Sequence, residues 1–333
     1  MSPLIKPYPL HRSRRLRRTS WIRDMVSEHS ASISDLIWPV FICDGFNKKE
    51  SIVSLPGVYR YSIDQVTEVA KEAIDLGINC LALFPYTPAD LKNPECTEAW
   101  NPDNLVNKAT RAIKKHTPNL GILLDVALDP YNSDGHDGLL RESEILNDET
   151  LIALEKQALT QASCGADILG PSDMMDGRVG IIRQALESKG YKDTLIMSYS
   201  AKFASSFYGP FRDAVGASGY LSGDKKTYQI DCANLEESIR ETALDVSEGA
   251  DMVMVKPGLP YLDVCMAIKR RLNVPTFAYQ VSGEYAMIES AHLNGFINRD
   301  LILLETLLSF KRAGCDGVLT YYAPEIAKLL DKK

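Results

Sequence analysis

The 333-residue sequence has no long apolar run, no clustered cysteines and no phosphate-binding glycine motif. Its longest apolar stretches, such as residues 37–43, are far shorter than the about 18 residues that suggest a membrane span. Residues 1–32 are basic, but no apolar segment follows the charges, so they do not resemble a secretory signal peptide. We therefore expect a cytoplasmic protein with no membrane partner.

The seven cysteines are odd in number and scattered, and no two of them have the spacing of a CxxC pair or a metal site. They are Cys43, Cys80, Cys96, Cys164, Cys232, Cys265 and Cys315. This pattern indicates reduced and mostly buried thiols rather than a disulfide framework.

Charge is unevenly distributed over a chain whose net charge is −7. Residues 1–32 contain seven Lys or Arg against Asp24 and Glu28, and the rest of the chain is strongly acidic. An acidic body argues against extended nucleic-acid binding, although the basic run 11–18 has the charge to contact phosphates. We expect the arm to contact an acidic protein surface instead.

Short apolar runs alternate with helical segments after this arm, and eight of the runs have the length of a strand. They span residues 36–43, 80–85, 121–128, 167–170, 194–200, 252–256, 276–281 and 317–321. Near-continuous hydrophobicity is typical of parallel strands covered on both faces. Before every second run a glycine ends the helix, as expected of the left-handed position there; these are Gly77, Gly165, Gly249 and Gly314.

This alternation predicts an α/β protein with a TIM (β/α)8 barrel and an extended N-terminal arm. A doubly wound sheet is the alternative, but no glycine-rich dinucleotide motif follows any of the runs. We expect residues 1–32 to form the arm and residues 33–333 a single catalytic barrel domain. Ser62 (with Gln65) and Asn147 are predicted to cap the helices that follow them.

The sixth run ends at Lys256, and Lys202 follows the fifth run by two residues, so both lysines lie where barrel enzymes place their catalytic groups. Either lysine alone can simply extend from the barrel rim into water. Two amines in one mouth disfavour each other's protonation, and partial burial acts in the same direction. The pair therefore suggests amines that attack a ketone and form Schiff bases.

A carboxylate cluster lies at the end of the third run: Asp125 is inside the run, and Asp129, Asp134 and Asp137 follow it, near His136. Such carboxylates can bind a hard cation or accept protons, and a solvated turn is the common alternative. The polar loop 171–178 follows the fourth run and contains Ser172.

The segment after Lys202 is glycine-rich and carries cations. This composition fits a lid over an anionic substrate, and it also fits an exposed flexible loop. Ser282 and Tyr321 are hydroxyl residues at the ends of the seventh and eighth runs, and they suit a carboxylate or a nearby backbone group.

Several long motifs together resemble the delta-aminolevulinic acid dehydratase family. They are residues 200–203 with 208–214, residues 249–258, and the segments 125–129, 171–177 and 279–287. The resemblance implies a TIM barrel whose N-terminal arm wraps a neighbouring subunit, usually in a homo-octamer. It also implies the reaction: two 5-aminolevulinate molecules condense asymmetrically to porphobilinogen with loss of two waters, an early step of haem and tetrapyrrole synthesis.

The resemblance also implies a role for each matching residue. Lys256 would hold the substrate that becomes the propionate side, with its carboxylate against Ser282 and Tyr321. Lys202 would hold the second substrate. The carboxylate of that second substrate would meet Arg212, Gln229 and either Lys225 or its neighbour Lys226. Ser172 would hydrogen-bond an amino group, and Tyr208 and Phe211 would be further substrate contacts. Asp125, Asp129 and Asp137 would order water and relay protons, with Asp129 and Asp137 as the alternative site of a cation.

Metal use separates the branches of this family. Zinc-dependent members have three cysteines where this chain has Ala127, Asp129 and Asp137, so a cysteine zinc site is not available. The chain resembles the magnesium-responsive branch, in which Glu241 matches the ligand of an activating, allosteric Mg²⁺ outside the active site. No organic cofactor is implied. Many members have histidine where this chain has Asp134.

Two other functions remain open at this stage. A class I aldolase on the same barrel would use Lys256 alone, with Lys202 as an electrostatic neighbour. A non-catalytic barrel would bind nucleic acid through residues 1–32.

Overall fold

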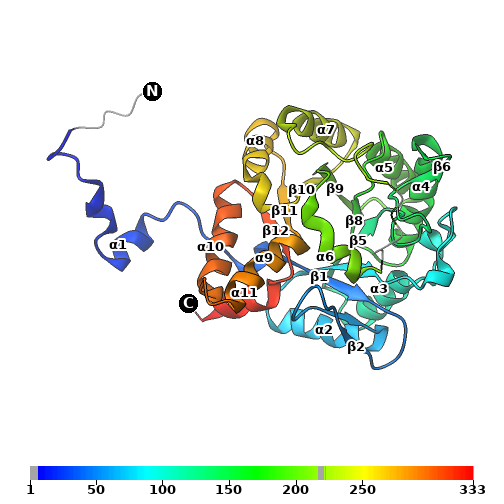
Figure 1. The fold of residues 1–333 in the computed structure, drawn as a ribbon, viewed down its shortest axis with the longest axis horizontal. Coiled ribbons are helices and arrows are strands. Elements are labelled where there is room, and N and C mark those ends of the chain that lie inside the picture. The colour runs from blue at the N-terminus through cyan, green and yellow to red at the C-terminus, as the bar shows by residue number, and fades with distance from the viewer. Residues whose placement is uncertain (1–6, 217–220, 222, 333) are drawn as a thin grey trace.

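The computed structural model describes residues 7–216, 221 and 223–332, with the backbone alone at Arg212 and Asp213 (Figure 1). Its strands are β1 (Leu36–Ile42), β2 (Lys49–Ser51), β3 (Tyr59–Tyr61), β4 (Cys80–Pro85), β5 (Gly121–Val126), β6 (Leu139–Arg141), β7 (Glu144–Leu146), β8 (Ile168–Pro171), β9 (Leu195–Lys202), β10 (Met252–Lys256), β11 (Thr276–Gln280) and β12 (Gly317–Thr320). Its helices are α1 (Ser20–Met25), α2 (Ile63–Asp75), α3 (Leu105–His116), α4 (Asn147–Ser163), α5 (Arg178–Lys189), α6 (Gly209–Ala214), α7 (Leu235–Glu248), α8 (Leu262–Leu272), α9 (Ser282–Leu293), α10 (Arg299–Arg312) and α11 (Ala323–Asp331).

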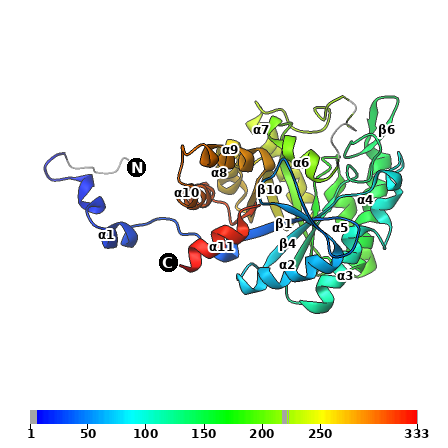
Figure 2. The same ribbon diagram turned by 60° about the horizontal axis from the view of Figure 1, so that its bottom comes forward.

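Eight parallel strands form a closed barrel in the order β1-β4-β5-β8-β9-β10-β11-β12. Pairing of β12 with β1, where Leu36 lies opposite Val318, closes the ring. Helices surround the strands in both views (Figures 1 and 2). These are the eight strands that the apolar runs predict, so the predicted TIM barrel is confirmed.

The barrel strands are apolar along their whole length because both of their faces are buried. All seven residues of β1 are buried, and so are all but the first residue of β9. The four predicted helix-ending glycines have the left-handed backbone conformation, with φ between 74° at Gly77 and 111° at Gly249. The regular βα units therefore bring all strand ends with polar residues to one mouth of the barrel.

Three details differ from the predictions. Strand β9 continues to Lys202 rather than ending at Ser200, so this lysine belongs to the strand itself. Two short antiparallel pairs, β2 with β3 and β6 with β7, have no apolar run that would predict them. Each of their strands has three residues and lies outside the barrel core.

Neither predicted helix cap forms through its side chain. Ser62 is the residue before α2, but its hydroxyl donates to Asp64 and to the carbonyl of Lys48 instead of accepting from the helix. Asn147 is the first residue of α4, and its side-chain amide exchanges two hydrogen bonds with the backbone of Asp176. Contacts with distant segments thus replace both local caps.

Residues 7–32 extend away from the barrel, with α1 at some distance from it (Figures 1 and 2). No side chain between residues 7 and 32 is buried, and Trp21 is 63% exposed. The division of the chain at residue 32 and the contact of this arm with other subunits stay predictions.

All seven cysteines are free thiols, and five of them are buried, as the sequence predicts. Among the described residues, no helix has both the length and the apolar character needed to cross a membrane.

Candidate active site

Lys202 and Lys256 are the last residues of the neighbouring strands β9 and β10, and they lie opposite each other in the register of the two strands. Both side chains are buried, with exposed fractions of 5% and 6%. They line the same cavity at the carboxyl ends of the strands. The sequence prediction of two amines in one mouth is thus matched by the geometry.

Nine residues singled out from the sequence line this cavity. They are Asp125, Asp129, Ser172, Lys202, Tyr208, Phe211, Lys225, Gln229 and Lys256. Gly135, Val215 and Leu221 complete the lining, and no sequence pattern predicts them as site residues. Strands β5, β8, β9 and β10 and the segment after β9 therefore converge on one space.

Lys202 lies in a polar environment. Its ammonium donates to the carbonyl of Ser172 and lies 3.5 Å from Asp137 Oδ1. On the other side of Asp137, the ammonium of Lys225 lies 3.1 Å from Oδ2 and also 3.7 Å from Asp129 Oδ2. Asp137, which is almost wholly buried, is therefore enclosed by two ammonium groups.

These two cations control the ionisation of Asp137. Burial acts to raise the pKa of this carboxyl, but the charges of Lys202 and Lys225 outweigh burial and hold the pKa well below its usual range. Asp129 responds in the opposite direction: burial and the nearby charge of Asp137 raise its pKa. One member of the carboxylate pair thus stays charged while the other takes up a proton more readily.

Lys256 is surrounded by aromatic rings instead. Its Nζ lies 4.9 Å from the ring centroid of Tyr279, 5.0 Å from Phe211, 5.2 Å from Tyr199 and 5.4 Å from Tyr208. Burial first, and then the positive charge of Lys202, lower the pKa of Lys256 to about 7. A large share of this amine is therefore neutral, and so nucleophilic, at neutral pH.

Asp125 is positioned to exchange protons near Lys256. Burial, and then the charge of Asp129, raise the pKa of Asp125 to about 6. In the described part of the chain its Oδ1 has no hydrogen-bond partner, and neither does the buried hydroxyl of Tyr199. Buried polar atoms of this kind in a cavity are suited to bind a ligand or an ordered water.

Ser282 and Tyr321 lie beside the cavity rather than in its lining. The hydroxyl of Ser282 accepts a hydrogen bond from the backbone N–H of Phe211 at 2.9 Å and so fixes the start of α6. The hydroxyl of Tyr321 lies 2.9 Å from that of Tyr279. Arg212 belongs to α6, but its side chain is outside the described part of the structure.

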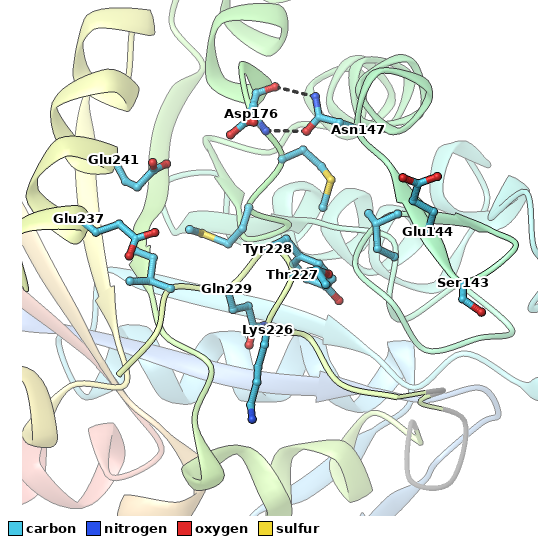
Figure 3. A pocket seen from close by; sticks show the side chains of 14 residues that line it. Ser143, Glu144, Asn147, Asp176, Lys226, Thr227, Tyr228, Gln229, Glu237 and Glu241 are labelled. Atoms are coloured by element: carbon cyan, nitrogen blue, oxygen red, sulfur yellow. Dashed lines mark hydrogen bonds between the residues drawn. The ribbon is translucent and has the colours of Figure 1, made fainter. Parts of the chain in front are cut away.

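Glu241 does not belong to this cavity. It lies on α7 and lines a separate pocket with Glu237, Asp176 and Lys226 (Figure 3). The pocket also includes residues 227–230, which directly follow Lys226 and end at the strand-like bridge to Phe203. The two pockets therefore share the chain segment that carries Lys225 and Gln229.

Tyr199 and Tyr279 are site residues that sequence reasoning missed. Both are fully buried on barrel strands, where an aromatic residue has the same pattern as any core residue. The available signal was position: Tyr199 precedes Lys202 by three residues on the same strand, and Tyr279 lies next to the last residue of β11.

A closed βα barrel with two buried amines side by side at its mouth defines a class of protein, the barrel enzymes that present lysine to a substrate there. Residues 10–329 match the family model for delta-aminolevulinic acid dehydratase. The chain belongs to the delta-aminolevulinic acid dehydratase family.

Individual relatives support this membership over nearly the whole chain. The delta-aminolevulinic acid dehydratase of Bradyrhizobium diazoefficiens is 57% identical over 319 residues, covering 96% of this chain and 90% of its own. The delta-aminolevulinic acid dehydratase of Rhodobacter capsulatus is 54% identical over 330 residues, and the match covers 99% of this chain and 99% of the relative. The crystal structure of the Toxoplasma gondii enzyme in complex with its reaction product porphobilinogen is 47% identical, covers 98% of this chain and 92% of its own, and superposes with a TM-score of 0.94.

The family fixes the activity: the chain is a hydro-lyase of tetrapyrrole synthesis that forms porphobilinogen. This displaces the aldolase and the non-catalytic barrel as functions of the molecule.

Proposed function

We propose that the chain makes porphobilinogen by holding two 5-aminolevulinate molecules as Schiff bases, one on Lys202 and one on Lys256. The observation that carries this proposal is the opposed position of the two lysines at the ends of β9 and β10, in one cavity. Substrates bound to adjacent amines are held close enough to react with each other, which removes most of the entropy cost of their encounter.

The chemistry follows from the two amines. A neutral lysine nitrogen attacks the ketone carbon, and loss of water from the adduct leaves an iminium that draws electrons from the neighbouring C–H bond. The carbanion of one substrate then attacks the other substrate's iminium carbon, and that carbon later expels its lysine as an amine while a neighbouring C–H bond loses its proton. The amino group of the attacked substrate adds to the iminium carbon of the first substrate and displaces the remaining lysine, and loss of one more ring proton completes the pyrrole. The lysines leave unchanged and two waters are released in total, so no organic cofactor is needed.

Protons in these steps move through the carboxylates. Asp125, whose pKa burial and Asp129 raise to about 6, can both accept a proton from carbon and return one to a leaving oxygen. Asp129 and Asp137 are proposed to continue this relay. Because the ammonium of Lys225 already contacts both of them, a metal cation would have to displace it, which favours the relay role over a metal site.

Substrate carboxylates meet fixed donors on two sides. We assign one carboxylate to Lys225, Gln229 and Arg212, and the other to Ser282 and Tyr321. Lys225 lines the cavity, whereas Lys226 is exposed and pairs with Asp224 at 3.8 Å, which supports Lys225 as the ligand. Ser172 is assigned to a substrate amino group, and Tyr208 and Phe211 form the wall over Lys256.

Trapping with borohydride tests the two Schiff bases directly. Reduction in the presence of 5-aminolevulinate should leave a stable adduct on both lysines, located by mass spectrometry of the peptides, while the untreated enzyme forms porphobilinogen. An adduct on Lys256 alone would refute the double Schiff base. If neither lysine carries an adduct while turnover is normal, Schiff-base formation is refuted for both lysines.

We propose further that Glu241 holds an activating Mg²⁺ through water. Burial raises the pKa of Glu241; Arg178 opposes this shift, and Asp245, Asp176 and Glu237 add to it. A hydrated dication would relieve this repulsion, and Mg²⁺ keeps several of its waters when it binds carboxylates. Among the described residues no three His, Cys, Asp or Glu side chains come close enough together to ligate a metal directly.

Chelation followed by metal addition tests this site. We expect loss of metal to lower activity several-fold and Mg²⁺, but not Zn²⁺, to restore it, and calorimetry to detect Mg²⁺ binding that Glu241→Gln removes. Glu236→Gln is the matched control, because Glu236 lies on the same helix and pairs with Arg271 at the surface. Full activity and an unchanged metal response in Glu241→Ala would remove the assignment.

Residues 1–32 are proposed to contact neighbouring subunits of a homo-octamer in the cytoplasm. The arm is basic and exposes Trp21 and Met25, and the rest of the chain is acidic, so a second copy offers a complementary surface. Light scattering should give an octamer for the full chain and a smaller species for residues 33–333. An unchanged mass would refute this role of the arm.

A further inference from the structure

Glu284 is a buried carboxylate that none of the steps above uses. It is the third residue of α9, the helix that follows β11, and its exposed fraction is 2%. Burial raises its pKa to about 7, against three backbone N–H groups that lower it. A buried carboxylate is costly to keep, so its contacts should explain its presence.

Those contacts join two barrel strands. Oε1 accepts from the N–H of Leu259 at 2.7 Å, and Oε2 accepts from Gly258 at 3.2 Å and from Val281 at 2.8 Å. Capping of α9 needs only the bond from Val281. The other two bonds come from the segment that directly follows Lys256 at the end of β10, so the carboxylate ties β10 to the start of α9.

The segment that contains Gly258 and Leu259 is tightly packed, so its backbone cannot shift without displacing its neighbours. A side chain at Gly258 would meet the ring of Phe310 at 2.7 Å and the carbonyl of Tyr279 at 3.0 Å. On its other side, the carbonyl of Lys256 accepts from the hydroxyl of Tyr208 at 3.1 Å and from the N–H of Phe203 at 2.9 Å. The backbone of Lys256 is therefore fixed from both directions, and Glu284 supplies the bonds on the α9 side.

Through α9, Glu284 is also linked to a substrate contact. The hydrogen bond from the N–H of Val281 to Glu284 spans Ser282, which lies between them in the sequence. The hydroxyl of Ser282 accepts a hydrogen bond from the N–H of Phe211. The ring centroid of Phe211 lies 5.0 Å from the amine of Lys256. One carboxylate thus sets the position of the lysine relative to the residue assigned to that lysine's substrate.

We propose that Glu284 is a positioning residue for Lys256. Its carboxylate fixes the backbone that follows the lysine against the start of α9, and so holds the amine among its aromatic rings, opposite Lys202. The proposal rests on the proposed function, because it takes Lys256 as a Schiff-base lysine. The proposed positioning concerns Lys256 only, because the ammonium of Lys202 is held by Ser172 and Asp137 instead.

That restriction to one lysine provides the test. The rate of borohydride trapping with 5-aminolevulinate is measured separately for the Lys256 and Lys202 peptides in the full-length enzyme. Glu284→Gln keeps the shape of the side chain but replaces one acceptor oxygen by a donor, so it breaks the bonds on one side without creating a cavity. We expect the rate at Lys256 to fall about tenfold, as displacement of a reacting group by a fraction of an ångström does, while the rate at Lys202 stays within about twofold.

Two further variants complete the experiment. Glu289→Gln is the matched control, because Glu289 is a buried carboxylate on the same helix that pairs with Arg299 instead, and it should leave the ratio of the two rates unchanged. Glu284→Asp keeps the charge on a shorter side chain and should give an intermediate ratio. If Glu284→Gln does not fold, Glu284→Asp decides by the same ratio.

An unchanged ratio of the trapping rate at Lys256 to that at Lys202 would overturn the proposal. This holds whether both rates persist or both fall, because a purely structural role of Glu284 would lower the two rates equally. Failure of the wild-type enzyme to give an adduct on Lys256 is a different result. That outcome would refute the proposed function itself, whatever the variants of Glu284 do.

Discussion

The two lysines of the cavity are adjacent in register but have opposite surroundings. Lys202 contacts Asp137 and a backbone carbonyl, and Asp137 in turn contacts Lys225, so this half of the site is ionic. Lys256 lies among four aromatic rings, and its pKa falls to about 7. The difference shows how one cavity can treat two identical substrates differently.

An asymmetric condensation needs such a difference. Because its pKa falls to about 7, the amine of Lys256 is neutral more often than that of an ordinary lysine, and the charge of Lys202 contributes to that state. The ionic half offers cations that can bind a substrate carboxylate. We infer that the asymmetry of the product begins in the contrast between the aromatic and the ionic half.

The largest effect should come from removing the amine of the aromatic half. Lys256→Ala should lower turnover at least ~10⁴-fold, because loss of the group that is proposed to form a covalent intermediate leaves only binding and electrostatic effects. Porphobilinogen formation measures this, with Lys189→Ala at the exposed end of α5 as the control. More than a trace of turnover in Lys256→Ala would mean that the aromatic half is not essential.

A smaller effect should come from the ionic half. Lys225→Ala removes a cation that contacts Asp129 and Asp137, and it should lower kcat/KM about 100-fold, as truncation of one member of a buried charge pair does. Lys226→Ala is the comparison one residue away, measured at saturating Mg²⁺ because Lys226 lines the pocket of Glu241. Lys226 is exposed, so its removal should change kcat/KM less than about twofold under that condition. Equal effects of the two substitutions would contradict the assignment of Lys225 to the cavity.

The sequence predicts the barrel well because parallel strands buried on both faces must be apolar along their whole length. Runs such as residues 80–85 and 252–256 match β4 and β10 to the residue. The β6–β7 hairpin could not be found in the same way, because its three-residue strands are only partly buried and carry no regular pattern. Ser62 and Asn147 bond with distant segments, which a local capping pattern cannot show.

The site is predictable to the extent that strand ends are. Lys202 and Lys256 are the last residues of their strands and Asp125 is the last but one of its strand, so reading the ends of the apolar runs predicts all three. The ring of Tyr199 and the carboxylate of Glu284 were not, because one looks like core and the other like a helix cap. The contact between Lys225 and Asp137 joins two loops far apart in sequence, and no local signal announces it.

The smallest effect tests the lowered pKa of Lys256. Burial and the charge of Lys202 lower the pKa of Lys256 to about 7 from 10.5, so its amine is mostly protonated below pH 7 and mostly neutral above it. Trapping at Lys256 should therefore be half-maximal near pH 7 and fall about tenfold for each pH unit below that. Trapping at this residue that still rises steeply above pH 9 would show an ordinary lysine.

Lys202→Met separates the two causes of this shift. Removing the neighbouring positive charge should move the half-maximal pH for trapping at Lys256 upward, because that charge disfavours the protonated amine. Burial is the larger cause, so the new value should remain well below 10.5. A half-maximal pH of 10.5 in Lys202→Met would mean that the charge of the ionic half alone lowers the pKa of Lys256. An unchanged half-maximal pH would mean that burial in the aromatic half alone lowers it. Only an intermediate value would show that both halves activate this amine together.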